Sequence, residues 1–331
     1  MAARGHRVTV YCREKPQERT YRGVALVYLP TWRHKYFETI AHTFLSTLHL
    51  LFHRKQVALY CNAANAIFTL WPRMAGIPVA LNVDGVERRR KKWNAAAKAW
   101  YLMSEHLATI FPSAVVTDAL SIRDYYQQRY SKPTTFIPYG AAVGIVPTSD
   151  ELSRLGLERR KYFLYVSRME PENNALLVRR AFEQTQTDLK LALIGDAPYA
   201  QDYIQRVRDT GDPRVVAPGA IYGQGYYELG SHCFAYIHAT EVGGTHPALI
   251  EAMGRGALVL YLDTPENAEV AGEAGIPFTH SDLPQRLSEV LEMPESERER
   301  LRSLAQARVA ERYSWEAVTD QYEDLLTALC R

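Results

Sequence analysis

The sequence of 331 residues contains 47% hydrophobic and 23% charged residues, a balance that is typical of globular proteins and excludes a disordered chain. Its length allows two domains of ordinary size, each able to bury its own core. Four scattered cysteines, Cys12, Cys61, Cys233 and Cys330, have no paired spacing, which disfavours metal knuckles and a disulfide framework and favours a reducing cytoplasm.

No apolar run approaches the roughly 20 residues that are needed to span a bilayer. The best candidate, residues 44–52, is short and is interrupted by Ser46, Thr47 and His49. A signal peptide is also not expected, because basic residues at the start of the chain lead directly into a strand-like segment.

Charge is divided unevenly along the chain, although the net charge is only +2. Residues 1–150 carry 20 Lys+Arg against 9 Asp+Glu, whereas residues 151–331 carry 19 against 28. Such asymmetry indicates a polyanionic or membrane-surface partner for the basic half.

The densest basic run is Arg-Arg-Arg-Lys-Lys at residues 88–92. One interpretation is a solvated helix face; the other is contact with an anionic lipid head group or a diphosphate-bearing acceptor. Nucleic acid is less favoured, because the run has no interleaved aromatic residues and no nucleic-acid motif accompanies it.

The first residues are typical of the end of a helix that is capped by Gly5, and residues 7–12 are typical of the strand that follows this helix. A βαβ unit of roughly 30 residues would supply a strand before that helix. Either Met1 is an internal start, which we favour, or the fold lacks its first strand.

The rest of the first half alternates between strand and helix patterns. A polar loop at residues 82–87 follows a buried strand, and its Asp84 and Glu87 are candidates for binding substrate hydroxyls at the carboxyl end of a parallel sheet. Turn chemistry alone could also explain Asp84-Gly85. Strands are expected at residues 24–29, 57–60, 78–83, 114–117 and 134–138, and helices at residues 38–53, 65–75 and 119–129, with a basic helix after residue 87.

Three histidines of the helix at residues 38–53, His42, His49 and His53, share one face by their spacing. A metal site is one explanation. The other, which we favour, is the polar face of an amphipathic helix, because the three lie opposite Ile40, Phe44, Leu48 and Leu51.

Periodicity lapses at residues 143–161, where we place a linker, and the second half then restarts the same alternation. Strands are expected at residues 162–167, 190–195, 214–218, 233–238 and 257–262, and helices at residues 175–184, 199–209, 226–231 and 267–273, with three more closing the chain and the last at residues 315–329. Two successive doubly wound α/β units predict two parallel sheets that face each other over a cleft.

The most informative stretch is Thr-Glu-Val-Gly-Gly-Thr-His-Pro-Ala-Leu-Ile-Glu-Ala-Met-Gly-Arg-Gly, residues 240–256. Thr245 suits a helix N-cap, and Pro247 suits the first turn because a missing N–H costs nothing there. Free N–H groups at a helix start bind anions, and Glu251 on the second turn could accept hydrogen bonds from sugar hydroxyls. An ordinary βα turn with a solvated glutamate is the competing interpretation.

Three further loops follow strands of the second half, at residues 165–174, 195–198 and 220–226, so a nucleotide is expected at the carboxyl edge of this sheet. The chain resembles a retaining glycosyltransferase of the GT-B fold in glycosyltransferase family four, most closely the rhamnosyltransferase-type subgroup of bacterial surface polysaccharide assembly. The resemblance covers the chain except for an N-terminal strand and glycine loop. Its motifs are Asn-Val-Asp-Gly-Val-Glu (82–87), Met-Glu-Pro-Glu-Asn-Asn (169–174), Ile-Gly-Asp-Ala-Pro-Tyr (194–199) and Glu-Val-Gly-Gly-Thr-His-Pro-Ala-Leu-Ile-Glu-Ala-Met (241–253).

The resemblance implies a role for each matching residue. Glu251 would bind the nucleotide ribose, Thr245 and the N–H groups after it the distal phosphate, and Arg168 the diphosphate as it leaves. Tyr222 would line the base pocket, and Asp84 would lie near the reacting sugar. The implied catalytic residues are Arg168, Asp84 and Glu241, and the implied donor-binding residues are Glu251, Gly243, Gly244, Thr245, His246, Asn173, Gly195 and Tyr222.

Two positions depart from the family pattern. The lysine that usually follows the arginine by five residues is Asn173 here, so Arg168 has less cationic help. The first carboxylate of the family's usual glutamate pair would stand at position 243, which is Gly243 here. Glu241 lies two residues earlier and is displaced by roughly 7 Å if the chain is extended. Whether Glu241 replaces that carboxylate stays open.

The resemblance further implies an acceptor-side domain at residues 1–145, a nucleotide-sugar domain at residues 146–314, and a closing helix at residues 315–331 that crosses back to the first domain. No metal is expected, because an Asp-X-Asp motif is absent, which is consistent with the metal-independent habit of the resembled fold. No cofactor is expected beyond the nucleotide sugar that serves as substrate. The expected partners are a nucleotide sugar, a glycan or polyprenyl-diphosphate-linked acceptor, and an anionic membrane surface that the basic half contacts at the inner face of the cell membrane.

Three other functions compete with a glycosyltransferase. An inactive sugar-nucleotide-binding module is supported by the absent first strand. A sugar-nucleotide epimerase shares the architecture but needs acid and base residues beyond His246 and Glu241. An oxidoreductase is disfavoured, because no Gly-X-Gly-X-X-Gly follows a strand.

Overall fold

The computed structural model describes residues 1–31, 37–198 and 200–331, and its contacts divide the chain into two compact units. Two short segments are assigned to a different unit from the residues next to them in the sequence. The basic residues Arg90–Lys92 belong to unit 2, and the end of the chain belongs to unit 1. Unit 1 consists of Met1–Arg89, Trp93–Ile137 and Thr319–Arg331, and unit 2 of Arg90–Lys92 and Pro138–Val318.

Unit 2 is built on a six-stranded parallel sheet with the order β10-β9-β8-β11-β12-β13. The chain moves outward from β8 to β10 and then returns to place β11 beside β8, so the strand order reverses between β8 and β11. Open parallel sheets bind ligands at the carboxyl ends of the strands at such a point. The strands are β8 (Tyr162–Val166), β9 (Lys190–Ile194), β10 (Val215–Gly219), β11 (Ala235–His238), β12 (Val259–Leu262) and β13 (Gly275–Phe278).

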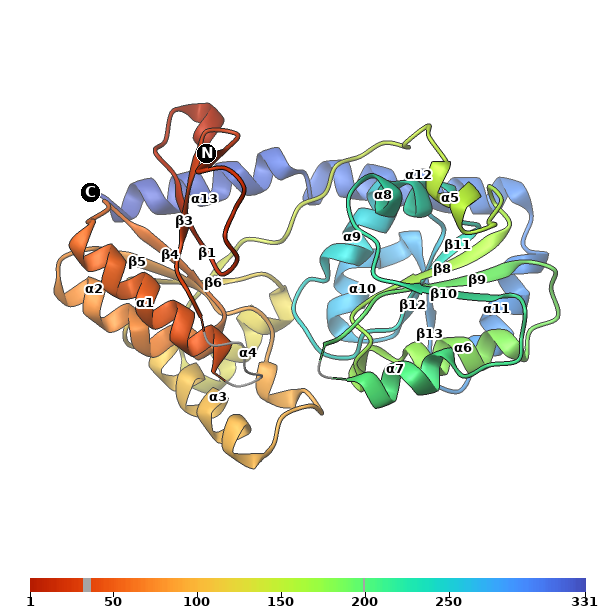
Figure 1. Cartoon of the computed structure of the whole chain (residues 1–331), viewed down its shortest axis with the longest axis horizontal. Helices are drawn as coiled ribbons and strands as arrows, with labels where there is room; N and C mark the ends of the chain where they lie inside the picture. The colour runs from red at the N-terminus through yellow and green to blue at the C-terminus, as the bar shows by residue number, and fades with distance from the viewer. Residues whose placement is uncertain (32–36, 199) are drawn as a thin grey trace. The chain divides into compact units, whose positions relative to one another are not determined.

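Helices cover both faces of this sheet, with α6, α7 and α11 on one face and α8, α9 and α12 on the other (Figure 1). Alternate strand residues point to opposite faces: Phe163 packs in the core with Phe182 of α6, whereas Leu164 packs with Ile250 of α9. The helices are α5 (Asp150–Arg154), α6 (Ala175–Glu183), α7 (Gln201–Arg208), α8 (Gln224–His232), α9 (Pro247–Gly254), α10 (Pro265–Ala271), α11 (Leu283–Glu292), α12 (Glu295–Arg312) and the start of α13 (Trp315–Leu329), with 3-10 helices η4 (Pro171–Asn173) and η5 (Gly272–Ala274).

Unit 1 contains two separate sheets, a parallel one with the order β4-β5-β6-β7 and a mixed one with the order β1-β3-β2. Every residue of β5 is buried, which is typical of a strand that helices cover on both faces. The strands are β1 (Thr9–Cys12), β2 (Thr20–Tyr21), β3 (Val24–Tyr28), β4 (Ala58–Cys61), β5 (Val79–Asn82), β6 (Ala114–Thr117) and β7 (Thr135–Phe136).

The helices of unit 1 pack around a core that includes Leu50, Phe68, Leu81, Ile122 and Tyr126. Tyr322 of α13 closes part of this unit, since its hydroxyl accepts a hydrogen bond of 2.9 Å from the Asn82 side chain. The helices are α1 (Glu38–Phe52), α2 (Leu70–Met74), α3 (Ala95–Ala108), α4 (Leu120–Tyr130) and the remainder of α13, with 3-10 helices η1 (Ala2–Arg4), η2 (Ala63–Thr69) and η3 (Glu87–Arg89).

Helix α1 corrects the prediction for its histidines. His42 is buried, and His49 is half-buried with its Nδ1 3.2 Å from the Tyr11 hydroxyl, while Phe44 and Leu48 are exposed. A polar helix face is expected to meet solvent, and this holds for His53, which is exposed. It is wrong for His42 and His49, because most of the polar side of α1 faces the sheets. There Thr47 Oγ1 lies 2.8 Å from the hydroxyl of Tyr60, so the inward polar groups find partners.

The α/β class is confirmed, and most predicted elements have a counterpart within a few residues. The start of the predicted helix at residues 199–209, Tyr199, lies outside the described residues. The predicted basic helix is wrong: residues 87–89 form only the short η3, and α3 begins after the basic run, at Ala95, where the Asn94 side chain accepts a hydrogen bond from the Ala97 N–H. Across residues 1–31, 37–198 and 200–331, no helix is both long and apolar enough to cross a membrane.

The start of α9 differs from the prediction by one residue. His246, not Thr245, occupies the N-cap position, and Pro247 is the first helical residue. A residue before proline is pushed out of the helical conformation, and His246 accordingly has φ −91° and ψ 108°. Thr245 is buried one residue further back.

Candidate functional site

A cavity of about 380 Å³ lies in unit 2 where β8, β10 and β11 end. This is the point at which the strand order of the sheet reverses, so the cavity is where a parallel sheet is expected to bind a ligand. Its lining residues are Arg90, Val166, Ser167, Arg168, Asn173, Ile221, Tyr222, Tyr226, His238, Thr240, His246, Pro247, Ala248 and Glu251.

Glu251 projects into this cavity from the second turn of α9. The hydroxyl of Tyr226, on α8, donates a hydrogen bond of 2.7 Å to its Oε2. A carboxylate has about four lone-pair sites on its two oxygens, so the side chain retains acceptors for a ligand. Tyr226 therefore orients a carboxylate that can accept hydrogen bonds from paired hydroxyls.

His246 has a defined protonation pattern. The Asn267 amide nitrogen donates to the carbonyls of Thr240 (3.0 Å) and Leu262 (2.9 Å), so its Oδ1 is the acceptor. His246 Nδ1 lies 2.8 Å from that oxygen and must carry the proton. In the neutral ring, Nε2 is then an acceptor, and this atom is buried against Gly243.

The His246 ring also explains why residue 243 is a glycine. A Cβ built on Gly243 would lie 2.2 Å from His246 Nε2, far inside van der Waals contact. A carboxylate cannot stand at position 243 while His246 holds this rotamer. The missing carboxylate at position 243 and the presence of His246 are therefore linked, because the two side chains would occupy the same space.

We expect Gly243→Ala to destabilise the protein by about 1–3 kcal/mol, as overpacking of a close-packed site does. Gly243 does not have a positive φ, so the cost comes from His246. Urea unfolding of the single variants and of Gly243→Ala/His246→Ala measures it. In the His246→Ala background, the alanine should cost almost nothing; an equal cost in both backgrounds would contradict this account.

Burial lowers the pKa of His246 to about 4, opposed by Asn267 and aided by the neighbouring cations Arg90 and Arg168. Burial together with His246 also holds the pKa of His238 well below its usual value; the two rings are 4.9 Å apart. Both imidazoles are therefore neutral at pH 7.

Stability should consequently fall as the pH drops from about 6.5 to about 4. In this window the unfolded chain binds a proton at His246 that the folded chain rejects, so unfolding becomes more favourable by up to about 1.4 kcal/mol per pH unit for this one group. Urea unfolding of the wild type and His246→Gln at several pH values measures the difference in slope. Parallel slopes would mean that His246 titrates normally in the folded state.

Arg168 follows β8 and reaches the cavity with a side chain that is 58% exposed. Its backbone is fixed by Asn173, whose amide nitrogen donates a hydrogen bond of 2.7 Å to the Arg168 carbonyl. Asn173 is itself held where the Tyr165 hydroxyl donates to its carbonyl at 2.7 Å. The residue in place of the usual lysine therefore positions Arg168 without adding charge.

A second cation, Arg90, stands in the same cavity. Its Nη1 and the Nη1 of Arg168 each lie 4.0 Å from Oε2 of Glu170, so the two guanidinium groups converge on one point. Arg90 is only 6% exposed and also lies 3.8 Å from the fully buried Glu172. Arg90 thus brings a second cation to the cavity from a distant part of the sequence.

The basic run is not a solvated helix face. Lys92 Nζ lies 3.0 Å from Glu170, Lys91 Nζ 2.8 Å from Glu241, and Arg88 Nε 3.0 Å from Glu105. Because each of these cations faces a carboxylate, the run is not an open basic patch.

Removing Arg90 should have two separable effects. Arg90→Gln strands the Glu172 carboxylate, and breaking a buried pair costs about 3–5 kcal/mol. The double variant Arg90→Gln/Glu172→Gln should recover most of that stability yet bind nucleoside diphosphate about tenfold more weakly, through loss of a charged contact. Urea unfolding and calorimetric titration measure the two effects; full affinity in the double variant would remove Arg90 from the anion site.

The remaining predicted site residues lie elsewhere. Glu241 does not line the cavity; burial raises its pKa, but hydrogen bonds from Lys91, Asn174 and His280 outweigh burial and lower it. Gly195 is fixed by close packing, since a Cβ there would lie 1.8 Å from the Ser167 carbonyl oxygen. Gly243, Gly244 and Thr245 form the buried turn behind the cavity wall.

Asp84 belongs to unit 1, in the loop after β5. It has a left-handed φ of 60°, and its carboxylate accepts a hydrogen bond of 3.0 Å from the Gly85 N–H. This is the turn chemistry that Asp-Gly favours.

The structure brings together Arg168, Asn173, Tyr222, His246 and Glu251 of the predicted residues. Sequence reasoning named none of Arg90, Tyr226 and His238 as a site residue. Arg90 carried a signal, a dense basic run, for which a solvated helix face and an anionic partner were both considered. Tyr226 ends the loop at residues 220–226 that was expected at the sheet edge, and His238 carried no signal beyond its position at a strand end.

Residues 160–293 match the family model described as "Glycosyl transferases group 1", and residues 63–142 match DUF1972, a domain of unknown function. No curated protein matches the sequence. Several solved structures are similar to the chain. Anabaena HepE in complex with UDP-glucose is 17% identical with a TM-score of 0.75, covering 91% of this chain and 86% of that one.

Two further solved structures are similar over nearly the whole chain. Sucrose-phosphate synthase from Thermosynechococcus elongatus is 18% identical with a TM-score of 0.76, covering 99% and 90% of the two chains. WaaG, a glycosyltransferase involved in lipopolysaccharide biosynthesis, is 16% identical with a TM-score of 0.73, covering 98% and 92%. These neighbours confirm the predicted GT-B class with two Rossmann-like units.

Proposed function

We propose that this chain, whose residues 160–293 form a glycosyltransferase group 1 domain, transfers a sugar from a nucleoside-diphosphate donor to an acceptor hydroxyl. The observation that carries the proposal is a single cavity lined by the Glu251 carboxylate and by a convergent pair of cations, Arg90 and Arg168. A nucleoside diphosphate offers the matching groups, ribose hydroxyls for the carboxylate and a diphosphate for the guanidinium groups.

In this arrangement the ribose hydroxyls donate to Glu251, which Tyr226 holds in place. The diphosphate lies toward the start of α9, where the helix dipole favours negative charge, and toward Arg168 and Arg90. Tyr222 is 85% exposed at the cavity rim and is available to cover the base.

Transfer breaks the bond between the anomeric carbon and the diphosphate oxygen, and the electron pair stays on that oxygen. The acceptor hydroxyl oxygen forms the new bond to the anomeric carbon, and its proton passes to the departing diphosphate. Negative charge therefore grows on the phosphate beside Arg168 and Arg90, which stabilise the transition state more than the ground state.

We further propose a retaining reaction of the family-four type, in which the acceptor attacks from the face that the diphosphate leaves and no enzyme nucleophile is needed. The two arginines provide the charge that a metal would otherwise supply, so a chelator such as EDTA should leave transfer unchanged. Rhamnose is the proposed sugar, on the resemblance of the sequence motifs.

The proposed acceptor is a glycan or polyprenyl-diphosphate-linked glycan of surface polysaccharide assembly. The similarity to WaaG, which is described as involved in lipopolysaccharide biosynthesis, supports an acceptor of this kind. A polyprenyl-diphosphate-linked acceptor lies in a membrane, and we propose that the basic N-terminal half meets the anionic inner surface of that membrane from the cytoplasm.

A panel of nucleotide sugars tests the proposal. The full chain is titrated with UDP-, GDP-, ADP- and dTDP-linked sugars by thermal shift, and each one that binds is incubated with a membrane extract as the acceptor source. We expect one donor to bind and its sugar to appear in the lipid fraction. Binding without transfer would identify a sugar-nucleotide-binding module, and no binding would refute the proposed site.

A further inference from the structure

The outward face of α1 and α2 is apolar. It consists of five side chains, which we call the apolar surface. They are Phe44 (45% exposed), Leu48 (42%), Phe52 (78%), Trp71 (40%) and Met74 (77%).

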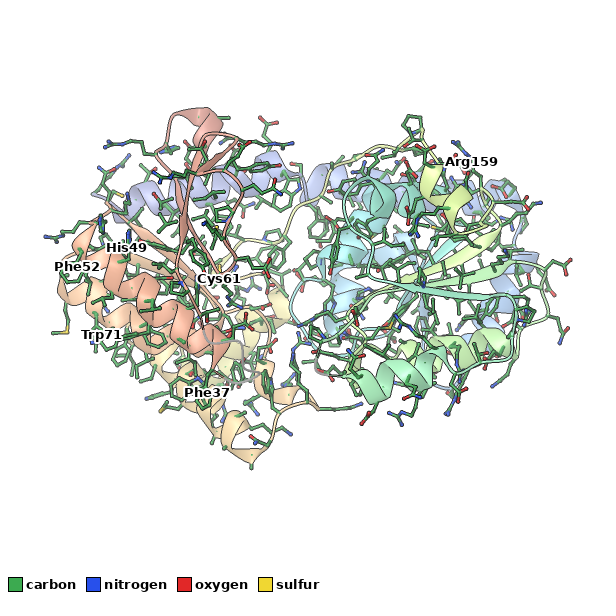
Figure 2. All side chains as sticks on the ribbon, in the orientation of Figure 1. Phe37, His49, Phe52, Cys61, Trp71 and Arg159 are labelled. Atoms are coloured by element: carbon green, nitrogen blue, oxygen red, sulfur yellow. The ribbon has the colours of Figure 1, made fainter. Side chains whose placement is uncertain are left out.

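These side chains form a connected surface. The rings of Phe44 and Trp71 meet edge to face with centroids 6.0 Å apart, so α1 and α2 contribute to one patch. At the other end, the guanidinium of Arg54 donates to the carbonyl of Ala75, which places the end of α1 beside Met74. Figure 2 labels Trp71 and Phe52 along this side of α1.

The arrangement is the reverse of an ordinary surface helix. A helix on a soluble domain turns its apolar stripe inward, whereas four of the five buried residues of α1 are His42, Thr43, Ser46 and Thr47, and only Leu50 is apolar. Phe44, Leu48 and Phe52 lie on the outside instead. A contiguous exposed apolar patch of this kind marks an interaction surface.

The chain segment that carries the apolar surface has charges of one sign. Residues 39–83, which include all five of its side chains, contain no Asp or Glu, whereas Arg54, Lys55 and Arg73 are present and exposed. Glu38, just before this segment, lies 3.9 Å from Arg13. Apolar and aromatic side chains bordered by lysine and arginine complement the acyl and head-group layers of an anionic bilayer.

We infer that the apolar surface docks into the interface of an anionic lipid bilayer, with α1 lying in the membrane plane. Phe52, Trp71 and Met74 enter the acyl boundary, and Arg54 and Lys55 reach the lipid phosphates. The proposed function includes a membrane contact that net charge alone supported until here. The apolar surface is the part of the chain that makes this contact, and anionic lipid is the class of ligand.

Vesicle sedimentation of the full chain tests the inference. One set of vesicles is phosphatidylcholine alone, and the other contains about one third phosphatidylglycerol. The wild type should bind the anionic vesicles at least tenfold more strongly. Phe52→Gln/Met74→Gln changes the two most exposed members of the apolar surface, and binding should fall about tenfold or more.

The matched control is Val143→Gln/Ile145→Gln, two residues of unit 2 that are 46% and 54% exposed; it should bind vesicles as the wild type does. Equal binding by the Phe52/Met74 variant, or a wild type that ignores anionic vesicles, would overturn the inference. So would a wild-type dimer that this variant makes monomeric, because a second copy would then cover the surface. Vesicle binding needs no donor, so failure of the proposed transfer would leave this result interpretable.

Discussion

Arg168→Ala should reduce sugar transfer about 10²- to 10³-fold while the protein remains folded. The side chain is 58% exposed and its contact with Glu170 is long, 4.0 Å. Lys92, 3.0 Å from Glu170, keeps this carboxylate paired when Arg168 is removed. Loss of one preorganised donor to developing negative charge typically costs this much in rate. Single-turnover kinetics with saturating donor measure the chemical step directly.

The control is Arg180→Ala, which removes an exposed arginine of α6 in the same unit; its turnover should match the wild type. Turnover of Arg168→Ala close to the wild-type value would refute the role in stabilising the leaving group. A loss confined to donor affinity would instead assign Arg168 to ground-state binding.

Glu251→Ala should weaken nucleoside diphosphate binding about 10- to 100-fold. The carboxylate accepts hydrogen bonds from ribose hydroxyls in the proposed complex, and hydrogen bonds to a charged group are worth about 1.5–3 kcal/mol. Isothermal titration with the free nucleoside diphosphate measures this without any acceptor.

Two comparisons accompany this titration. Glu273→Ala removes an exposed glutamate of the same unit and should change nothing. Tyr226→Phe removes only the hydroxyl that orients Glu251, so its loss of affinity should be smaller than that of Glu251→Ala. Unchanged affinity in Glu251→Ala would exclude Glu251 from the ribose site.

The fold class and much of the site could be predicted because they depend on local pattern. Buried strands such as β5 and β12 read as continuous apolar runs, and the residues that follow parallel strands must meet at one sheet edge. The loop that contains Arg168 was placed at this edge on that basis, and Glu251 was placed on the second turn of the helix that follows the next site loop. The resemblance supplied their roles, and both residues line the cavity.

What escaped prediction depends on tertiary partners. Arg90 enters the cavity because Glu170 and Glu172 attract it there, and no spacing in the sequence links residue 90 to residues 170–172. His246 took the N-cap in place of Thr245, although the Pro247 that causes it was recognised. For α1, periodicity separated the two faces correctly, but polarity assigned the wrong one to solvent, because Tyr60 and Tyr11 provide partners for its polar side.

The central claim is that this cavity binds a nucleotide sugar and cleaves it at the bond between the sugar and the diphosphate. Phosphorus NMR of the full chain with its bound donor and an acceptor extract, beside Arg168→Ala, tests it most directly. The expected result is donor-dependent release of intact nucleoside diphosphate by the wild type and almost none by the variant. Release of nucleoside monophosphate, or equal release by both proteins, would contradict the claim.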